Sequence, residues 1–145
     1  MKKLLVALLA LMFLLPAPAF AIHKGAVVQE FPGPDGPGGA HLWAKLVIDD
    51  HDFQPQIRAM LVFSNPGDRI ARVHVSYLKL VRFSTDVRNT GSFIVDVPAH
   101  ETLAVAGTYV FNPNGTYHSR TRLWVCFSGF ACGNVKVWNS QDVRY

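Results

Sequence analysis

The amino-acid sequence predicts an all-β protein whose single domain is a two-sheet antiparallel sandwich, immunoglobulin-like, with about seven to nine short strands. Three observations support this prediction. Apolar residues alternate with polar ones from residue 41 onward, clusters of Gly, Pro, Asn and Ser interrupt the alternation, and residues 22–145 lack a long apolar stripe at the helical period of about 3.6 residues. Alternation of this kind places one face of each strand on a core.

The first segment is typical of a cleaved secretory signal peptide. Two lysines precede an apolar run of 12 residues, Leu4–Leu15, and Ala19 and Ala21 occupy the positions that a signal peptidase reads. We therefore expect residues 1–21 to be removed on export to a bacterial periplasm or to the medium. The remaining 124 of the 145 residues are enough for one domain and too few for two.

Charge and composition exclude several classes of protein. Without Lys2 and Lys3 the chain has 12 basic residues against 10 acidic ones, a net charge of +2, which excludes a polybasic nucleic-acid binder. Fifteen aromatic residues follow residue 21, so the mature chain is not disordered. No other segment approaches the roughly 18 apolar residues of a membrane-spanning helix, so we expect no integral span in the mature chain.

Residues 22–40 are predicted to form an N-terminal segment that ends in a loop. Ala26–Val28 can form a first strand, and Phe31–Gly39 then contains three Pro and four Gly. Such a composition supports neither a helix nor a ladder of strand hydrogen bonds. The loop therefore separates this segment from a β-sandwich domain at residues 41–145.

Within the domain, six stretches alternate as half-buried strands do, and the turn clusters between them contain Asn and Gly. A seventh stretch, Ala71–Phe83, changes parity between Tyr77 and Lys79, which predicts a β-bulge or a bend there. The alternating stretches are Leu42–Ile48, Ile57–Phe63, Phe93–Val97, Leu103–Phe111, Thr121–Phe127 and Val135–Val137, and the turn clusters are Ser64–Asp68, Arg88–Gly91 and Asn112–Gly115.

Strands that cross a membrane also alternate, and chains of that kind often end in an aromatic residue, as this one does at Tyr145. The Pro-rich loop, the two cysteines and the short strands favour the sandwich over this alternative.

Cys126 and Cys132 are the only cysteines of the chain. In an oxidising compartment an even cysteine count predicts a disulfide bond. Two thiolates are too few for a zinc site, which usually has four ligands. A bridge across the final hairpin fits the close approach of a non-hydrogen-bonded pair of facing residues.

The bridge also predicts which side chains of that hairpin face outward. If Cys126 faces Cys132, then Leu123 and Val135 meet on the core side, and Val137 follows Val135 inward. The opposite face then gathers two indoles and three cations, which suits an anionic partner or ligand. A solvated face, or one covered by another segment of the chain, is the alternative. The predicted partner or ligand face comprises Arg120, Arg122, Trp124, Lys136 and Trp138.

The sequence predicts no metal site, no cofactor and no catalytic residue. Asp49–Asp52 lacks the spacing of a calcium loop and is expected to be a solvated turn, and the six His form no pair at metal-binding spacing. Ser128 lacks the flanking glycines of a hydrolase nucleophile, and Glu30 and Glu101 are the only glutamates. We therefore expect a protein that is not an enzyme.

The functional expectation is a non-catalytic exported module that binds an envelope or extracellular protein, in an interaction or inhibitor role. A carbohydrate-binding module and a small periplasmic hydrolase are the alternatives. A glycan site would present coplanar exposed aromatics, whereas a protein-binding site would present a mixed apolar patch. The exposure of Trp43, Trp124 and Trp138 therefore discriminates between the first two classes.

Overall fold

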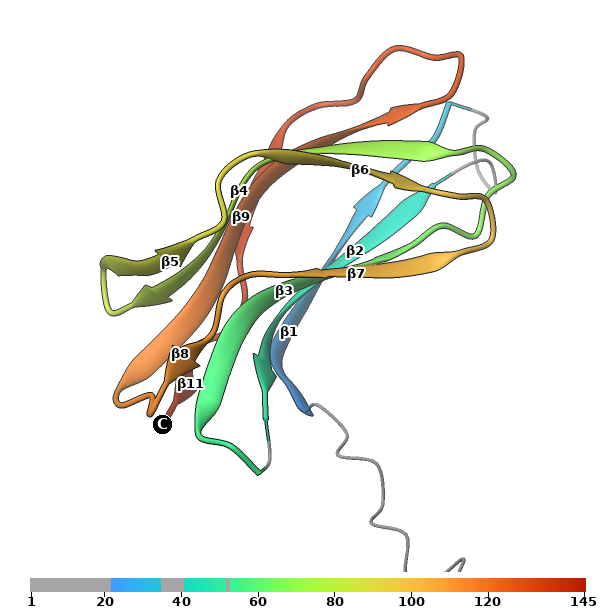
Figure 1. Cartoon of the computed structure of the whole chain (residues 1–145). Helices are drawn as coiled ribbons and strands as arrows, with labels where there is room; N and C mark the ends of the chain where they lie inside the picture. The colour runs from blue at the N-terminus through green and yellow to red at the C-terminus, as the bar shows by residue number, and fades with distance from the viewer. Residues whose placement is uncertain (1–21, 35–40, 52) are drawn as a thin grey trace, which may run out of the picture.

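The computed structural model describes residues 22–34, 41–51 and 53–145, so the predicted signal peptide and part of the Pro/Gly-rich loop lie outside the described residues. The described residues form eleven strands in two antiparallel sheets and no helix (Figure 1). The prediction of an all-β, two-sheet arrangement is confirmed. The strands outnumber those predicted because two of them, β8 and β11, are only two residues long, too short for alternation to show.

The first sheet has the strand order β1-β2-β3-β7, with β8 paired to β3 beyond the end of β7. Residues 22–31, which the sequence places in a segment ahead of the sandwich, form an edge strand of this sheet. The strands are β1 (Ile22–Phe31), β2 (Leu42–Asp50), β3 (Gln56–Ser64), β7 (Thr102–Ala106) and β8 (Val110–Phe111).

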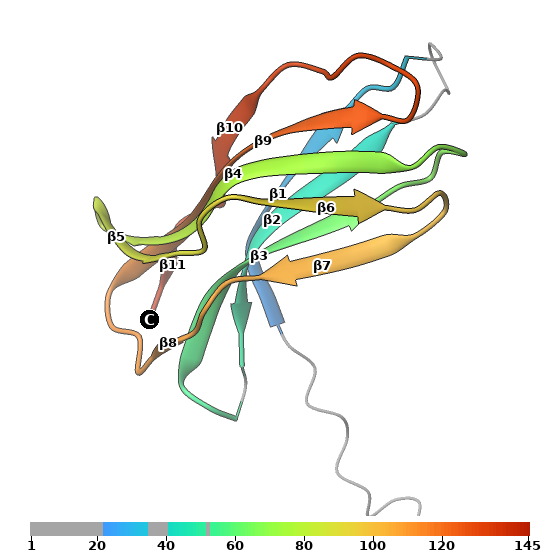
Figure 2. The same ribbon diagram turned by 45° about the horizontal axis from the view of Figure 1, so that its top comes forward.

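The second sheet has the order β10-β9-β4-β5, with β11 also paired to β9 and β6 also paired to β4. The strands are β4 (Ala71–Arg82), β5 (Thr85–Asn89), β6 (Phe93–Val97), β9 (Thr116–Phe127), β10 (Lys136–Asn139) and β11 (Val143–Arg144). Two orientations show the sheets as two layers, with β4 and β9 in one layer and β2 and β3 in the other (Figures 1 and 2).

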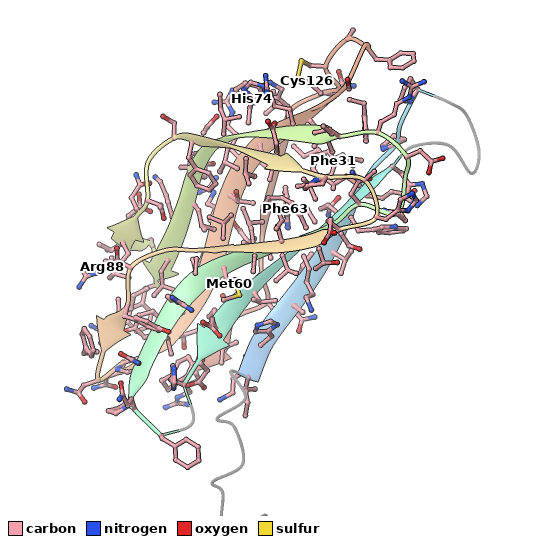
Figure 3. All side chains as sticks on the ribbon, turned by 45° about the vertical axis from the view of Figure 1, so that its right-hand side comes forward. Phe31, Met60, Phe63, His74, Arg88 and Cys126 are labelled. Atoms are coloured by element: carbon pink, nitrogen blue, oxygen red, sulfur yellow. A yellow bond between two sulfur atoms is a disulfide. The ribbon has the colours of Figure 1, made fainter. Side chains whose placement is uncertain are left out.

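The core fills the space between these layers, because the inward parity of each long strand is apolar. Leu46 and Phe63 from the first sheet and Val73 and Leu123 from the second are fully buried, and Figure 3 shows Phe63 between the sheets. Burying each such side chain stabilises the fold by about 1.5–3 kcal/mol. One polar link crosses the same space: the Ser119 hydroxyl donates to the Val47 carbonyl at 2.8 Å.

A β-bulge lies in β4, next to the position where the sequence changes parity. The register against β9 shifts between Val75 and Tyr77, which leaves Ser76 as the extra residue. The bulge allows Val75 and Leu78 both to reach the core, because it absorbs the odd spacing between them. It also turns the side chain of Tyr77 to the outside of the second sheet.

The predicted disulfide joins Cys126 to Cys132, and these residues face each other as an isolated pair at the end of β9. The register predicted for the rest of this hairpin is wrong by one residue. Leu123 faces Lys136 instead of Val135, and Thr121 faces Trp138 instead of Val137. The shift arises between Gly133, whose NH donates to the Val125 carbonyl at 2.9 Å, and the start of β10.

The shift follows from the size of the side chains that compete for the core. In the observed register Trp138 is 8% exposed, whereas Val135 and Val137 are 47% and 49% exposed. The indole packs against Phe31, with 6.0 Å between ring centroids. An aromatic ring buries about 150–250 Å². Burying one tryptophan at this sheet edge therefore stabilises the fold more than burying the two valines would.

Candidate functional site

The outer face of the second sheet, the side turned away from the core, carries the largest group of residues that could bind a partner. It combines exposed cations, stacked rings and aliphatic side chains from four strands. We call it the cationic face, and its residues are His74, Tyr77 and Lys79 on β4, Ile94 on β6, Arg120, Arg122 and Trp124 on β9, and Val137 on β10.

Three of the five residues predicted for this face lie on it. Arg120 and Arg122 are exposed and Trp124 is half-buried, all with their side chains on the outer parity of β9. The other two do not lie on it. Trp138 belongs to the core, and the Lys136 ammonium turns to the sheet edge, where it lies 4.7 Å from the ring centroid of Phe31 and bonds to a main-chain carbonyl of β1.

A stacked pair of rings marks the centre of the cationic face. His74 and Trp124 are direct neighbours on β4 and β9, with ring centroids 5.0 Å apart and planes inclined by only 4°. Figure 3 shows His74 and Cys126 on this same side of the sheet. An open hollow of about 480 Å³ lies beside the pair and is lined also by Ser92 and Ile94. The hollow thus offers apolar walls with a few polar groups, as ligand sites do.

Two of the cations beside the stacked pair have no carboxylate partner in the described part of the chain. Arg120 faces Lys79 across the strands, and Arg122 faces Tyr77. Lys79 is already paired with Asp86 at 2.5 Å and lies 4.8 Å from the Tyr77 ring centroid. Like charges on facing residues repel one another, so an anion placed between Arg120 and Lys79 would be stabilised.

Arg72, near this face, is neutralised by a carboxylate. Arg72 donates two hydrogen bonds of 2.8 Å to the carboxylate of Asp96 on β6. The hydrogen bond from Arg72 is the main cause that lowers the pKa of Asp96 below its usual value, and it raises the pKa of Arg72. The uncompensated charge therefore concentrates on β9.

The three tryptophans lie in three different environments. Trp43 is exposed on the outer side of the first sheet, with its ring edge-on to His41. Trp124 is half-buried on the second sheet, and Trp138 is in the core. The described residues therefore present no platform of coplanar exposed indoles, which is the arrangement expected of a glycan site.

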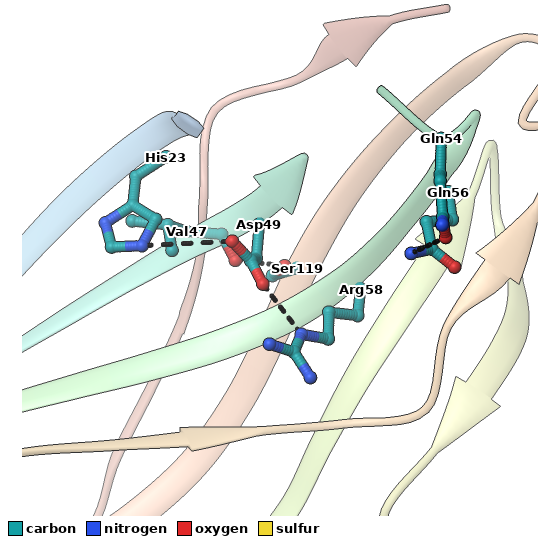
Figure 4. A network of polar contacts seen from close by, with 7 residues as sticks. All are labelled: His23, Val47, Asp49, Gln54, Gln56, Arg58 and Ser119. Atoms are coloured by element: carbon teal, nitrogen blue, oxygen red, sulfur yellow. Dashed lines mark hydrogen bonds and ion pairs between the residues drawn. The ribbon is translucent and has the colours of Figure 1, made fainter. Parts of the chain in front are cut away.

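A buried acidic residue lies on the outer side of the first sheet, where the sequence predicts a solvated turn. Asp49 ends up inside β2, 1% exposed, with its Oδ2 2.7 Å from Nε of Arg58. His23 Nε2 lies 3.9 Å from the other oxygen, which accepts no hydrogen bond (Figure 4). Within the described ranges no cluster of three or more His, Cys, Asp or Glu could hold a metal ion.

The residues that sequence reasoning missed come from β4, β6 and β10, where Val137 lies on the cationic face although the predicted register turns it to the core. The alternation of β4 indicates that His74 points away from Val73 and Val75, but only the non-local pairing of β4 with β9 places it against Trp124. No local pattern specifies which distant strands pair.

Comparison with known proteins yields no relative: no protein-family model matches the chain, no curated protein matches its sequence, and no solved structure matches its fold. In the described part of the chain no helix is long and apolar enough to cross a membrane.

Proposed function

We propose that the chain is an exported, non-catalytic interaction module that binds an anionic surface of an envelope or extracellular protein through the cationic face. In this proposal residues 1–21 are the signal peptide, and the sandwich is of immunoglobulin-like type. The disulfide between Cys126 and Cys132 fits an oxidising compartment.

One observation carries the proposal. Arg120 and Arg122 are exposed and without carboxylate partners in the described residues, four and two residues before Trp124 on the same face of β9. The His74–Trp124 stack and an open hollow lie on that face. Trp and Arg are the residues in which binding energy concentrates at protein interfaces. Half-buried aromatic rings flanked by exposed Ile94 and Val137 form the mixed apolar patch that a protein partner would contact.

The test is affinity capture from an envelope extract with the exported protein as bait. We expect Trp124→Ala to weaken capture by about 2 kcal/mol, roughly thirtyfold, because the indole is the largest ring of the patch. Arg120→Glu with Arg122→Glu should slow association and alter its salt dependence. Trp43→Ala and Lys45→Glu on the first sheet are the matched controls. Equal capture by all of these variants would refute the proposal.

A glycan is the second candidate ligand, and the hollow beside Trp124 is the observation that favours it. Its lining includes His74, Ser76 and Ser92 next to the indole, and sugars need such polar groups beside a ring. Binding to acidic polysaccharide arrays, abolished by Ser92→Leu as well as by Trp124→Ala, would indicate a glycan. Protein capture that persists in Ser92→Leu would indicate a protein partner.

A further inference from the structure

One end of the sandwich, next to Lys79 at the margin of the cationic face, carries the three most exposed large hydrophobic side chains of the described residues. Phe53, Phe83 and Phe111 are 78%, 67% and 66% exposed. They come from three separate connections: Phe53 from the loop between β2 and β3, Phe83 from the turn between β4 and β5, and Phe111 from the end of β8. Single exposed apolar side chains are normal on a protein surface, but several large ones gathered at one place indicate an interaction surface.

Main-chain contacts bring these connections to the same end. The NH of Asn112, next to Phe111, donates to the Pro55 carbonyl at 2.6 Å, and the NH of Phe83 donates to the Thr116 carbonyl at 3.2 Å. The Phe83 ring lies so close to Gly115 that a Cβ there would come within 3.3 Å of it. Figure 1 shows the β2–β3 loop, β8 and the β4–β5 turn along one end of the molecule.

Three arginines without carboxylate partners among the described residues lie at this end of the sandwich. The Arg88 guanidinium bonds only to the carbonyls of Val87 and Tyr109. Arg82 lies over the rings of Phe83 and Tyr117, and Arg144 on β11 is exposed. Two acidic residues near this end are already paired, Asp50 with Lys24 and Asp86 with Lys79. A third acidic residue, Asp142 beside Arg144, is exposed and has only His118 as a partner, at 3.1 Å. Among the described residues the three arginines outnumber this carboxylate, so the end is apolar with an excess of positive charge.

The backbone of Phe83 adopts a conformation that a bulky residue rarely takes. Its φ is 55°, in the left-handed region that glycine or asparagine adopts with less strain. A bulky residue held in this conformation at an exposed turn is a strained position of the kind that occurs at functional sites.

The direction of the chain supplies the last observation. Ile22 begins β1 at this end, where it pairs with Asp50 just before the β2–β3 loop. The 21 residues that precede Ile22 include the apolar run Leu4–Leu15. Only six residues separate Leu15 from Ile22. As long as the apolar run is held in a bilayer during export, which rests on the proposed function, this end of the sandwich therefore stays near the lipid surface.

We propose that this end is a docking site for an anionic phospholipid bilayer, which we call the aromatic end and define by Phe53, Phe83, Phe111, Arg82, Arg88 and Arg144. The three rings enter the boundary between headgroups and acyl chains, as aromatic residues do at membrane interfaces. The arginines contact lipid phosphates, for which the guanidinium group is suited.

The experiment uses the protein recovered from an exporting host, in the form that export leaves. Vesicles of phosphatidylethanolamine with phosphatidylglycerol are compared with vesicles of phosphatidylcholine in a flotation assay. We expect binding to the anionic vesicles that weakens with added salt. Phe83→Asn suits the backbone at this turn and should weaken binding several-fold without loss of thermal stability. Phe53→Ser combined with Phe83→Asn and Phe111→Thr should weaken it by about tenfold or more.

The depth to which the aromatic end enters the bilayer is measured separately with Phe53→Trp and Phe111→Trp. Vesicles of brominated lipid quench the fluorescence of an indole that inserts into them. Phe130→Trp, on the disulfide loop at the opposite end of β9, is the matched control. Additional quenching at positions 53 and 111 but not at 130 supports the proposal. Equal quenching at all three positions, unchanged flotation of the triple variant, or flotation that ignores lipid charge would overturn it. None of these outcomes bears on partner capture by the cationic face, so the two proposals fail independently.

Discussion

The outer sides of the two sheets use charged residues in opposite ways. On the first sheet Asp49 is buried and bonded to Arg58, and Val47 and Met60, which also point outward by the strand period, are covered as well. On the second sheet Arg120 and Arg122 remain exposed and without carboxylate partners in the described residues. Removing one partner of a desolvated ion pair is strongly destabilising, whereas an exposed unpaired cation is available to a partner. The first side is therefore a buried, structural surface, and the second is the one that we propose for binding.

The largest effect should come from Trp138, which the sequence predicts on the partner face and the structure places in the core. Trp138→Ala removes a buried ring packed on Phe31 and should lower the free energy of unfolding by about 3 kcal/mol. Trp124→Ala, on the face itself, should lower it by about 1 kcal/mol or less. Urea unfolding of both variants measures the two changes in the free energy of unfolding. If Trp124→Ala is the more destabilising of the two, the assignment of the second side to binding is wrong.

The buried acid on the first sheet should give the next largest effect. Asp49→Ala leaves the Arg58 guanidinium without its partner, and removing one partner of a buried pair is costly. Because Arg58 is 27% exposed and can reach water, we expect a loss of about 2–3 kcal/mol in the free energy of unfolding. Asp96→Ala on the second sheet is the matched control, and its exposed pair should change little. If denaturant unfolding gives equal losses of unfolding free energy for Asp49→Ala and Asp96→Ala, the proposed difference between the outer sides of the two sheets is wrong.

A smaller effect of opposite sign is expected at the β4–β5 turn. Phe83→Gly removes a side chain from a position with φ of 55° and should stabilise the protein by about 1 kcal/mol. The thermal midpoint should therefore rise by a few degrees. A fall in the midpoint would mean that the Phe83 ring contributes to packing, and it would remove the strain argument from the aromatic end.

The smallest effect concerns pH. Burial is the main cause that raises the pKa of Tyr145 far above its usual value, and the Asp50 carboxylate adds to it. The unfolded chain therefore loses this phenolic proton first, so stability is fully present below pH of about 10 and falls as the pH rises above it. Tyr145→Phe should reduce this alkaline loss, measured as the urea midpoint against pH. An identical alkaline profile for wild type and variant would contradict it.

Much of the fold could be predicted because its cause is local. The two-residue period defined the strands, turn clusters of Asn and Gly defined their ends, and the parity change near Tyr77 predicted a bulge that the structure places at Ser76. The disulfide followed from the number of cysteines and is present. Each of these signals lies within a few neighbouring residues.

What could not be predicted depends on competition between distant residues. The register of the last hairpin is set by the fit of Trp138 against Phe31, which lies more than a hundred residues away in the sequence. The same holds for the cationic face, since the pairing of β4 with β9 brings His74 to Trp124. The aromatic end was missed because Phe53, Phe83 and Phe111 belong to three connections that only the folded chain brings together.

A second β-bulge lies in β1, where the register against β2 shifts between Lys24 and Val27, and it has a consequence for how copies of the protein meet one another. At Gly25 the strand turns its carbonyl toward the second sheet, where the NH of Gln141 donates to it at 2.8 Å, and the Lys136 ammonium bonds to the Glu30 carbonyl. An edge strand with free main-chain groups is a template to which another chain can add a strand. Here two acceptors of the longest edge strand among the described residues are already engaged within the molecule, so β1 is shielded against strand-to-strand aggregation even at high protein concentration.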